Sequence, residues 1–541
     1  MKRFFTIFLS SIVMIGLWGQ KVPMTVVGDM YIAGKGNVRS MGPVHVKALP
    51  ADTGKVHVAS TGKLVVEDSI IFYSNAQSDG LLMNENPGDA VDVKGVVVRK
   101  NFAKDYTVYR VSFPFDVDLT TGVRDSRDGR TLKVRTDFGV QYYDPQQRAD
   151  DGKNQEKNWK ELPVDSSILH KGQAYRIAIS YSGEAEFIAK SPADVKALFD
   201  NGDKGIDLTY AISSNRGKFM NPDVSEGWNA FGGLNSTNFI ISGATVNYNN
   251  NRTVYFWGGG TDWEELLLDS PKKGTLRPYA VIFVQTGSPT NLSFMFRKDG
   301  GITLASDTPV FRSSQSDSKD ILGLWLTDAN NSSKASDTYF KFNEGYNKFY
   351  RSSEDAVKLN TSSTSVPIVW SLAQNGNNDE RVVLFSNCLP RGENEVPLGI
   401  NIPAAGKYVF SLEEIANETV KSAVLWDKVS GAKTDLTNNN YAFQADGSIN
   451  AEDRFVIIFS KTATSLDPLQ PKASVIYAYA DNNVLTVKNL IPGDKVQVLD
   501  ITGRIIASGV ASGDAFSVTL SQKGVYIVNV KGEKSIKVLN K

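Results

Sequence analysis

Two of the three histidines are the residues whose type and spacing first suggest chemistry. His45 and His57 occupy the same place in two matching phrases, Val44-His45-Val46 and Val56-His57-Val58, twelve residues apart. Imidazoles stacked on adjacent β-coils are potential metal ligands, but the spacing fixes no third ligand and favours solvent-facing strand histidines. His170 is accompanied by no Gly-x-Ser-x-Gly nucleophile phrase, which argues against a serine hydrolase. The histidines therefore predict neither a metal site nor a catalytic triad.

Paired carboxylates are the second possible source of catalysis. Glu264 and Glu265 follow Asp262-Trp263, and a glycosidase needs two carboxyl groups about 5–10 Å apart. Adjacent residues of a strand point to opposite faces, so these two cannot form that pair by themselves. The loop at 375–380 carries oxygen ligands suited to Ca²⁺, but its spacing differs from an EF-hand loop and favours a solvated hairpin turn. We expect no catalytic residue, no metal and no cofactor.

Aromatic residues beside glycine are the stronger functional lead. Tyr255-Phe256-Trp257 is followed by three glycines at 258–260 and then by Trp263. Flexible glycine between tryptophans is able to present a ring to a glycan or to a protein. The alternative is a strand that buries two of these rings in a core. Trp257 and Trp263 are therefore the candidate ligand platform.

The composition limits both the number of domains and the class of partner. A chain of 541 residues is too long for a single core, at about 150 residues per domain. Its 59 basic and 59 acidic residues give a net charge of zero, which argues against a nucleic-acid partner because such proteins carry a basic excess. The single cysteine, Cys388, permits no intrachain disulfide, so the cores alone must hold the fold.

Turn residues recur at intervals of about 8–12 residues along most of the chain, which is typical of stacked all-β domains. Two short stretches are exceptions. Residues 191–199, with a serine cap and a proline in the first turn, predict a helix, and residues 411–416 predict a short helical turn. The polar stretch 146–160 predicts a long exposed loop. The sequence thus predicts an all-β, multi-domain protein with little helix.

The N-terminus, residues 1–19, has the pattern of a secretory signal peptide. Lys2 and Arg3 precede an apolar run over 4–17, and Gly19 is the small residue at the cleavage position. That run is shorter than the ~20 residues that span a bilayer, which favours a cleaved signal over a membrane anchor. The rest divides into a β-solenoid-like or β-roll-like repeat segment at 20–90, β domains at 91–212 and 213–305, a β-sandwich domain at 306–460, a linker with two prolines at 461–472 and a terminal module at 473–541.

Short glycine-separated strands in the terminal module carry the phrases Val498-Leu499-Asp500-Ile501-Thr502-Gly503-Arg504, Lys523-Gly524-Val525-Tyr526-Ile527-Val528 and Lys537-Val538. Through them the module resembles the type A sorting domain of the type IX secretion system, by which Bacteroidota export proteins across the outer membrane. Glycine at 503 is predicted to take a positive φ in a hairpin turn, and glycine at 524 to start a strand. The resemblance implies an Ig-like β-sandwich sorting domain; a generic terminal Ig-like domain is the alternative. It also implies a sorting signal formed by Gly503, Gly524, Tyr526 and Lys537.

Further phrases lie in the body of the chain, among them Val111-Ser112-Phe113-Pro114-Phe115-Asp116-Val117, Lys171-Gly172-Gln173-Ala174-Tyr175 and Gly406-Lys407-Tyr408-Val409-Phe410. Through them the body resembles large adhesin-like surface proteins of the same bacteria, a family with no agreed catalytic set. This chain departs from that family at Gly232-Gly233-Leu234-Asn235, because relatives usually carry Asn-Pro after the preceding Trp-Asn. The departure puts any function of that loop in doubt.

The two resemblances together imply a secreted, non-catalytic protein of the cell surface, adhesin-like or structural. It would pass through the periplasm and be exported by the type IX machinery to the extracellular face of the outer membrane. The resemblance also implies removal of the sorting domain, which we expect within about residues 461–475, and attachment of the body to surface lipopolysaccharide. A host or dietary glycan or a matrix protein is the implied ligand, and a glycan-binding or glycan-degrading surface protein is the alternative.

Overall fold

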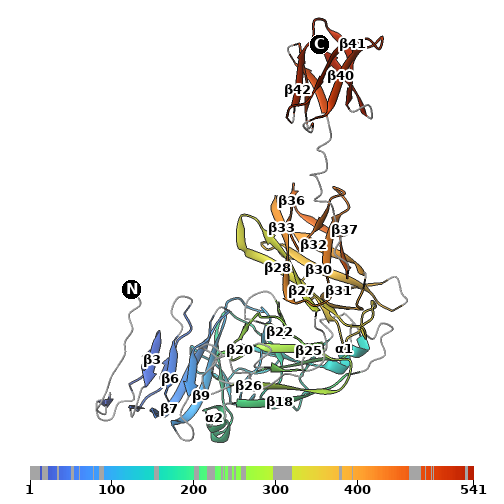
Figure 1. The fold of residues 1–541 in the computed structure, drawn as a ribbon. Helices are drawn as coiled ribbons and strands as arrows, with labels where there is room; N and C mark the ends of the chain where they lie inside the picture. Colours follow the sequence, from blue (N-terminus) through green and yellow to red (C-terminus); the bar gives the residue numbers. More distant parts are fainter. Residues whose placement is uncertain are drawn as a thin grey trace.

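Strands form nearly all of the regular structure in this computed structural model, with two helices among the residues that it describes (Figure 1). The all-β, multi-domain class is therefore confirmed. Most of the expected signal peptide and nearly all of the expected linker lie outside the described residues. The described residues are 13–14, 22–32, 36–49, 54–59, 61–76, 78–84, 90–151, 158–199, 206–215, 226–232, 236, 238–241, 246–248, 251–257, 263–296, 320–376, 380–392, 394–461, 477–481, 483–488, 490, 493–513, 515–530 and 534–540.

The N-terminal strands stack in parallel and form three faces, as a β-solenoid does. One face is β2-β5-β7, a second is β3-β6-β8, and a third is β4-β7-β9. Valine, leucine, isoleucine and phenylalanine alternate inward along these strands and are almost completely buried. The strands are β1 (Val13–Met14), β2 (Met24–Val26), β3 (Asp29–Ile32), β4 (Asn37–Ser40), β5 (Val44–Val46), β6 (Lys55–Val58), β7 (Lys63–Ser74), β8 (Leu81–Asn84) and β9 (Val91–Phe102).

One coil of this solenoid is 26 residues long, as the pairing of Val44 with Ile70 and of Lys55 with Leu81 shows. The twelve-residue spacing of the two histidine phrases therefore separates two faces of one coil, and the expectation of adjacent coils is wrong. Gly54 and Gly80 occupy the same corner of successive coils. A Cβ at Gly80 would lie 2.2 Å from the Val46 carbonyl oxygen, so only glycine fits that corner.

The second unit extends the solenoid sheet, because β9 pairs antiparallel with β17, and β17 with β12. A separate sheet has the order β10-β16-β13-β14. One apolar core runs through the solenoid and this unit, across the expected boundary at residues 90 and 91. The elements are β10 (Tyr109–Val111), β11 (Val117–Asp118), β12 (Val123–Asp125), β13 (Phe138–Tyr143), α1 (Pro145–Asp151), β14 (Trp159–Glu161), β15 (Ile168–Leu169), β16 (Tyr175–Ile179), β17 (Gly183–Ile188) and α2 (Pro192–Phe199).

The third unit contains a four-stranded sheet, β19-β25-β22-β23, and a three-stranded sheet, β18-β26-β21, with a smaller β20-β24 pair. Its apolar core draws residues from all three sheets. The strands are β18 (Ile206–Ile212), β19 (Trp228–Gly232), β20 (Phe239–Ile241), β21 (Val246–Asn247), β22 (Thr253–Trp257), β23 (Trp263–Leu267), β24 (Gly274–Leu276), β25 (Val281–Gln285) and β26 (Thr290–Phe296).

The fourth unit is a single connected set of eleven strands in the order β35-β34-β37-β32-β30-β31-β28-β27-β33-β36, with β29 beside β31. Register shifts in β27, β32 and β31 bend this set around one apolar core. The strands are β27 (Asp320–Asp328), β28 (Asn331–Phe342), β29 (Ala356–Val357), β30 (Ile368–Gln374), β31 (Arg381–Leu389), β32 (Asn394–Ile402), β33 (Gly406–Ala416), β34 (Ser422–Asp427), β35 (Lys433–Asp435), β36 (Tyr441–Ala445) and β37 (Ile449–Ser460).

Buried polar contacts join the solenoid to the third unit. Arg277 Nε donates to Asp79 Oδ2 at 2.7 Å, and its two terminal nitrogens donate to the carbonyls of Ala76 and Asn75, both at 2.8 Å. The Arg277 and Asp79 side chains are 13% and 2% exposed. Because a buried charge is costly unless it is paired and hydrogen-bonded, this arrangement holds the two units in one relative position.

Similar contacts join the third unit to the fourth. The Tyr255 hydroxyl donates to the Val357 carbonyl at 2.7 Å. Lys358 Nζ lies 3.1 Å from Glu265 Oε2, and both side chains are almost completely buried. Apolar residues of the second, third and fourth units also share one cluster around Trp228 and Phe283. The first four units thus form one continuous body.

The C-terminal module is a sandwich of a three-stranded sheet, β38-β39-β42, and a four-stranded sheet, β41-β40-β43-β44. Its apolar core consists of residues of the module itself. Figure 1 shows the module in red, with β40, β41 and β42 labelled. The strands are β38 (Tyr477–Asp481), β39 (Val484–Lys488), β40 (Lys495–Asp500), β41 (Ile505–Val510), β42 (Ala515–Thr519), β43 (Gly524–Val530) and β44 (Lys534–Asn540).

One of the two expected helical stretches forms and the other does not. Residues 192–199 form α2, and Ser191 Oγ accepts a hydrogen bond from the Asp194 backbone nitrogen at 3.2 Å, as an N-cap does. The expectation of helix at 411–416 is wrong, because these residues end strand β33. Pairing of these residues with β27 outweighs the local helical preference of Leu-Glu-Glu.

Candidate functional site

The two candidate platform residues lie opposite each other on one hairpin. Strands β22 and β23 pair antiparallel with Trp257 in register with Trp263. The Trp263 ring is half-buried and stands edge-on to Phe283, with centroids 4.8 Å apart and planes at 88°. The side chain of Trp257 lies outside the described part of the structure. Trp263 therefore lines a pocket, and its role as a ligand platform stays a prediction.

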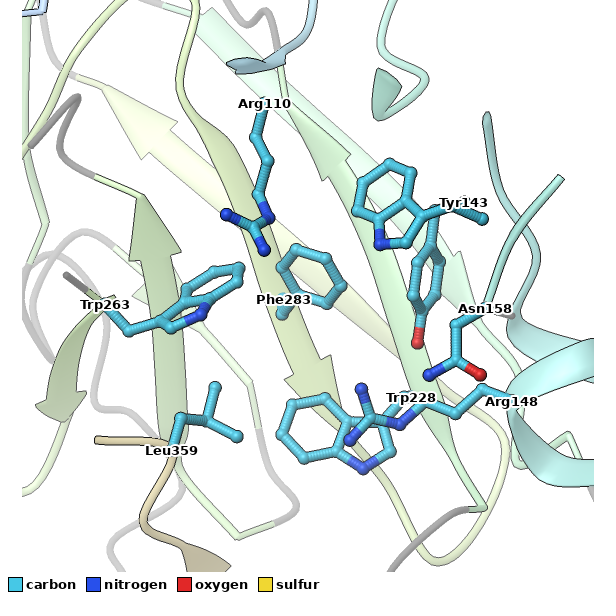
Figure 2. Close-up of a pocket in the computed structure, with 9 residues that line it drawn as sticks. Arg110, Tyr143, Arg148, Asn158, Trp228, Trp263, Phe283 and Leu359 are labelled. Atoms are coloured by element: carbon cyan, nitrogen blue, oxygen red, sulfur yellow. The ribbon is translucent and has the colours of Figure 1, made fainter. Parts of the chain in front are cut away.

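That pocket lies where the second, third and fourth units meet (Figure 2). Its cavity measures about 20 Å³, which is room for one water-sized group. Aromatic and cationic side chains dominate the lining, and no Asp or Glu is among its described residues. The lining residues are Arg110, Tyr143, Arg148, Asn158, Trp159, Trp228, Trp263, Phe283 and Leu359.

Two arginines of the pocket stack on two of its tryptophans. The Arg148 guanidinium carbon lies 4.2 Å from the Trp228 ring centroid, and that of Arg110 lies 5.3 Å from the Trp263 centroid. Such contacts attract a cation to the face of an aromatic ring. Burial, together with repulsion from Arg176, lowers the pKa of Arg110 to about 10. The pocket is therefore a partly dehydrated region of positive charge.

Polar groups of the pocket remain without protein partners among the described residues. Asn158 is 1% exposed, and neither its Oδ1 atom nor Arg148 Nε has a hydrogen-bond partner in the described structure. Burial raises the pKa of the nearby Tyr143 hydroxyl, which keeps that group a neutral donor. Figure 2 shows these three side chains converging above the indole of Trp228. Buried polar atoms that lack partners cost free energy, so a bound group able to pair with them would be stabilised.

Sequence reasoning missed this cluster because it assigned residues 146–160 to an exposed loop. The first part of that expectation is wrong: α1 occupies Pro145–Asp151 and carries Arg148 over the pocket. Asp144 Oδ1 accepts a hydrogen bond from the Gln147 backbone nitrogen at 2.9 Å. An Asp cap before Pro145 at the first helical position is a helix-start signal that was present in the sequence.

The histidines do not come together. His45 lies on β5 and His57 on β6, in different sheets. His45 Nδ1 is 3.0 Å from the Tyr73 hydroxyl, and burial, followed by the charge of Arg99, lowers the pKa of His45. His170 Nδ1 lies 3.9 Å from Asp116 Oδ2 on the surface. Among the residues that the structure describes, no group of three metal-ligating side chains occurs.

The adjacent glutamates point to opposite faces of β23, as the strand period predicts. Glu264 is exposed, whereas Glu265 is buried against Lys358 and accepts a hydrogen bond from the Leu359 backbone nitrogen at 2.6 Å. Glu265 thus fastens the third unit to the fourth. The proposed calcium loop, 375–380, lies partly outside the described residues. Burial raises the pKa of the Cys388 thiol, which disfavours the reactive thiolate.

The residues expected to form the sorting signal occupy one turn and two strands of the module. Gly503 has a φ of +84° in the turn between β40 and β41, and Gly524 starts β43. Tyr526 is 6% exposed, and its hydroxyl donates to the Gln522 carbonyl at 2.9 Å. Lys537 is exposed on β44, opposite Ile527. The positive φ of Gly503 and the start of a strand at Gly524 are confirmed, and the role of the four residues in sorting stays a prediction.

Comparison with known proteins identifies a family for the C-terminal module alone. Residues 469–540 match the model of a domain of unknown function, DUF6383. No curated protein matches the chain. No helix among the described residues has the length and apolar character that crossing a bilayer requires.

Three solved structures overlap parts of the chain at low similarity. PorZ, an essential bacterial surface component of the type IX secretion system of Porphyromonas gingivalis, is 12% identical, with 40% of this chain and 42% of PorZ covered and a TM-score of 0.11. The BSP domain of a biofilm-associated protein is 9% identical, covering 81% of this chain and 97% of that one at a TM-score of 0.11. Dimeric latent PorU from Porphyromonas gingivalis is 11% identical, covering 67% and 36% at a TM-score of 0.10. At these TM-scores the overlaps assign neither a fold nor an activity to this chain.

Proposed function

We propose that this chain is a non-catalytic protein of the bacterial cell surface, adhesin-like or structural, which the type IX secretion machinery exports through residues 473–541. The surface form would lack this module and be attached to lipopolysaccharide. A ligand of the body would then be a glycan or a matrix protein.

The construction of the C-terminal module is the observation that carries this proposal. Residues 477–540 form a two-sheet sandwich with a core of their own, and a family model matches almost the same residues as a unit. A domain that folds on its own core can be read by a machine and then removed without unfolding the rest of the chain. Ile501 and Ile505 stand 73% and 52% exposed at the turn that contains Gly503, and exposed apolar groups of this kind favour recognition by another protein.

Deletion of residues 473–541 tests the export step. We expect the shortened body to accumulate in the periplasm, as cell fractionation and surface labelling would show. The matched control attaches 473–541 to an unrelated folded reporter behind the same N-terminal 19 residues, and this reporter should reach the surface. Normal surface display of the shortened body would contradict the proposal.

Mass spectrometry of the surface form tests the removal step. The expected mature C-terminus lies within about residues 461–475, between the last strand of the body and the first strand of the module. A surface form that ends at Lys541 would contradict removal.

Glycan binding without catalysis is the second candidate function. The pocket that Trp263 lines favours glycan binding over a simple structural role, because its aromatic wall lies beside the Arg148 Nε and Asn158 Oδ1 atoms, which lack partners among the described residues, and such a combination is typical of ligand sites. An array of glycans and matrix proteins, probed with the full chain, would separate these roles. Binding to neither class would leave the structural role.

A further inference from the structure

Among the cations that stack on aromatic rings elsewhere in the described residues, lysines such as Lys47 and Lys433 have no carboxylate partner, whereas five other cations do. Arg127, for example, lies 4.2 Å from the Tyr181 centroid and 2.7 Å from Asp125 Oδ2. In this arrangement the ring covers one face of the cation while the acid neutralises its charge. The five ion pairs are Arg99–Glu186, Arg127–Asp125, Lys272–Asp337, Lys358–Glu265 and Arg454–Asp427.

Arg148 stacks on an aromatic ring but has no carboxylate partner among the described residues. Its guanidinium lies at the same 4.2 Å from an aromatic centroid, that of Trp228, yet it forms no ion pair with any described residue. The described lining of the pocket beside it contains a second arginine, Arg110, and no carboxylate. A half-buried cation without a partner is unfavourable, and an anion placed in the pocket would relieve that cost.

The neutral groups of the pocket suit a carboxylate in particular. A carboxylate accepts two parallel hydrogen bonds from a guanidinium and can accept more from amide and hydroxyl groups. The Arg148 guanidinium, the Asn158 amide nitrogen and the Tyr143 hydroxyl, which are all donors, lie around the same small space (Figure 2). The Asn158 Oδ1 atom is an acceptor and offers nothing to a carboxylate. Asn158, at 1% exposed, is a built part of the protein interior and not a mobile surface group.

The size of the cavity limits how much of a ligand can enter. A space of about 20 Å³ admits one water-sized group, so one carboxylate oxygen can enter it and a sugar ring cannot. The ring would remain at the mouth, where Trp263 and Leu359 are both half-buried and still partly accessible. The apolar CH face of a sugar packs well on an indole ring.

We propose that this three-unit pocket binds an acidic sugar, with Arg148 and Asn158 holding the carboxylate and Trp263 packing against the sugar ring. The proposal goes beyond export and surface display, and it stands whether or not the C-terminal module is a sorting domain. It names the class of ligand that the body would recognise on a polysaccharide, namely a sugar that carries a carboxylate.

Titration of the purified full chain with sodium glucuronate, followed by tryptophan fluorescence and calorimetry, tests the proposal. We expect saturable binding of glucuronate and none of glucose at the same concentrations. Acetate should bind more weakly than glucuronate, because it lacks the ring that contacts Trp263. If glucose bound as tightly as glucuronate, the role of the carboxylate would be contradicted. If acetate bound as tightly, the contact between the sugar ring and Trp263 would be contradicted. If glucuronate did not bind, the whole proposal would be wrong.

Two substitutions assign the roles within the pocket. Arg148→Met removes the charge but keeps an unbranched side chain over Trp228, and we expect the Kd for glucuronate to rise about tenfold or more. Trp263→Leu should weaken glucuronate binding while leaving acetate binding unchanged. Unaltered glucuronate binding in Arg148→Met would overturn the assignment.

The matched control for Arg148→Met is Arg127→Met, because Arg127 stacks on its ring at the same distance but already has an acid partner. We expect this variant to bind glucuronate as the unmodified chain does. Arg148→Lys keeps the charge, and it should retain more affinity than Arg148→Met even if both variants unfold at a slightly lower temperature. Equal loss of binding in Arg127→Met and Arg148→Met would overturn the specific role of Arg148.

Discussion

The body and the C-terminal module are stabilised in different ways. In the body, buried ion pairs and hydrogen bonds cross from one unit to the next, as Arg277 with Asp79 and Lys358 with Glu265 show. In the module, the core is internal, and the ion pair Arg504–Asp500 lies on the surface with the arginine side chain 77% exposed. The body therefore gains stability from contacts between units, whereas the module depends on its own core and can be cut away.

The largest effect is expected from breaking a contact between units of the body. Arg277→Ala leaves Asp79 buried without a partner, and loss of one partner from a buried pair costs about 3–5 kcal/mol. Scanning calorimetry of the full chain should show the transition of the body at a lower temperature. The matched control, Arg504→Ala in the module, should cost less than about 1 kcal/mol because that pair is exposed. Equal costs for the two substitutions would contradict the comparison.

A core substitution in the module should change the module alone. Leu485 is fully buried, and Leu485→Ala should lower the free energy of unfolding of the module by about 2–5 kcal/mol. Denaturant titration should then show the module unfolding earlier and the body at its original midpoint. Leu539, at 54% exposed, provides the control, since Leu539→Ala removes little buried surface. A shift of the body's midpoint in Leu485→Ala would mean that the two regions are coupled.

The smallest expected effect is the contribution of Asp427 to the pH dependence of the body's stability. Burial alone would raise the pKa of Asp427, but hydrogen bonds from Arg454 and Tyr441 outweigh it and lower the pKa below the usual 3.8. The ionised form thus stabilises the fold above pH 3.8, and that contribution is lost as pH falls through the lowered pKa. Asp427→Asn should cost about 1.5–3 kcal/mol at neutral pH.

The free energy of unfolding, measured from neutral pH to below 3.8, should accordingly fall less steeply with acid in Asp427→Asn than in the unmodified chain. The control is Asp453→Asn, because Asp453 pairs with Arg381 while its side chain is 84% exposed. This control should leave the acid dependence unchanged. An identical acid dependence in all three proteins would contradict the role of Asp427.

Local patterns predicted the elements well where one signal acted alone. Alternation and turn residues gave the all-β class, and the serine and proline at 191 and 192 gave the start of α2. Prediction failed where two signals competed, as at 411–416, where pairing with β27 outweighed helical preference. It also failed at Pro145, where a polar composition concealed a capped helix.

The length of the solenoid coil was also beyond prediction from local spacing. The two Val-His-Val phrases are visible in the sequence, but a twelve-residue spacing fits either a short coil or two faces of a longer one. Only the pairing of Val44 with Ile70 decides for the longer coil and places His45 and His57 in different sheets. The hypothetical pair of metal ligands depended on that choice.

The sequence by itself determined the class of the fold, the separate terminal module and the tight turn at Gly503, because each of these follows from neighbouring residues. The tertiary structure alone brought Arg148, Asn158 and Trp263 together, since they lie on three different segments of two units. It also paired Glu265 with Lys358 of the next unit, and it left Arg148 without a carboxylate partner among the described residues. Packing brings together charged residues that are far apart in the sequence, so the spacing of neighbouring residues cannot predict which of them form ion pairs.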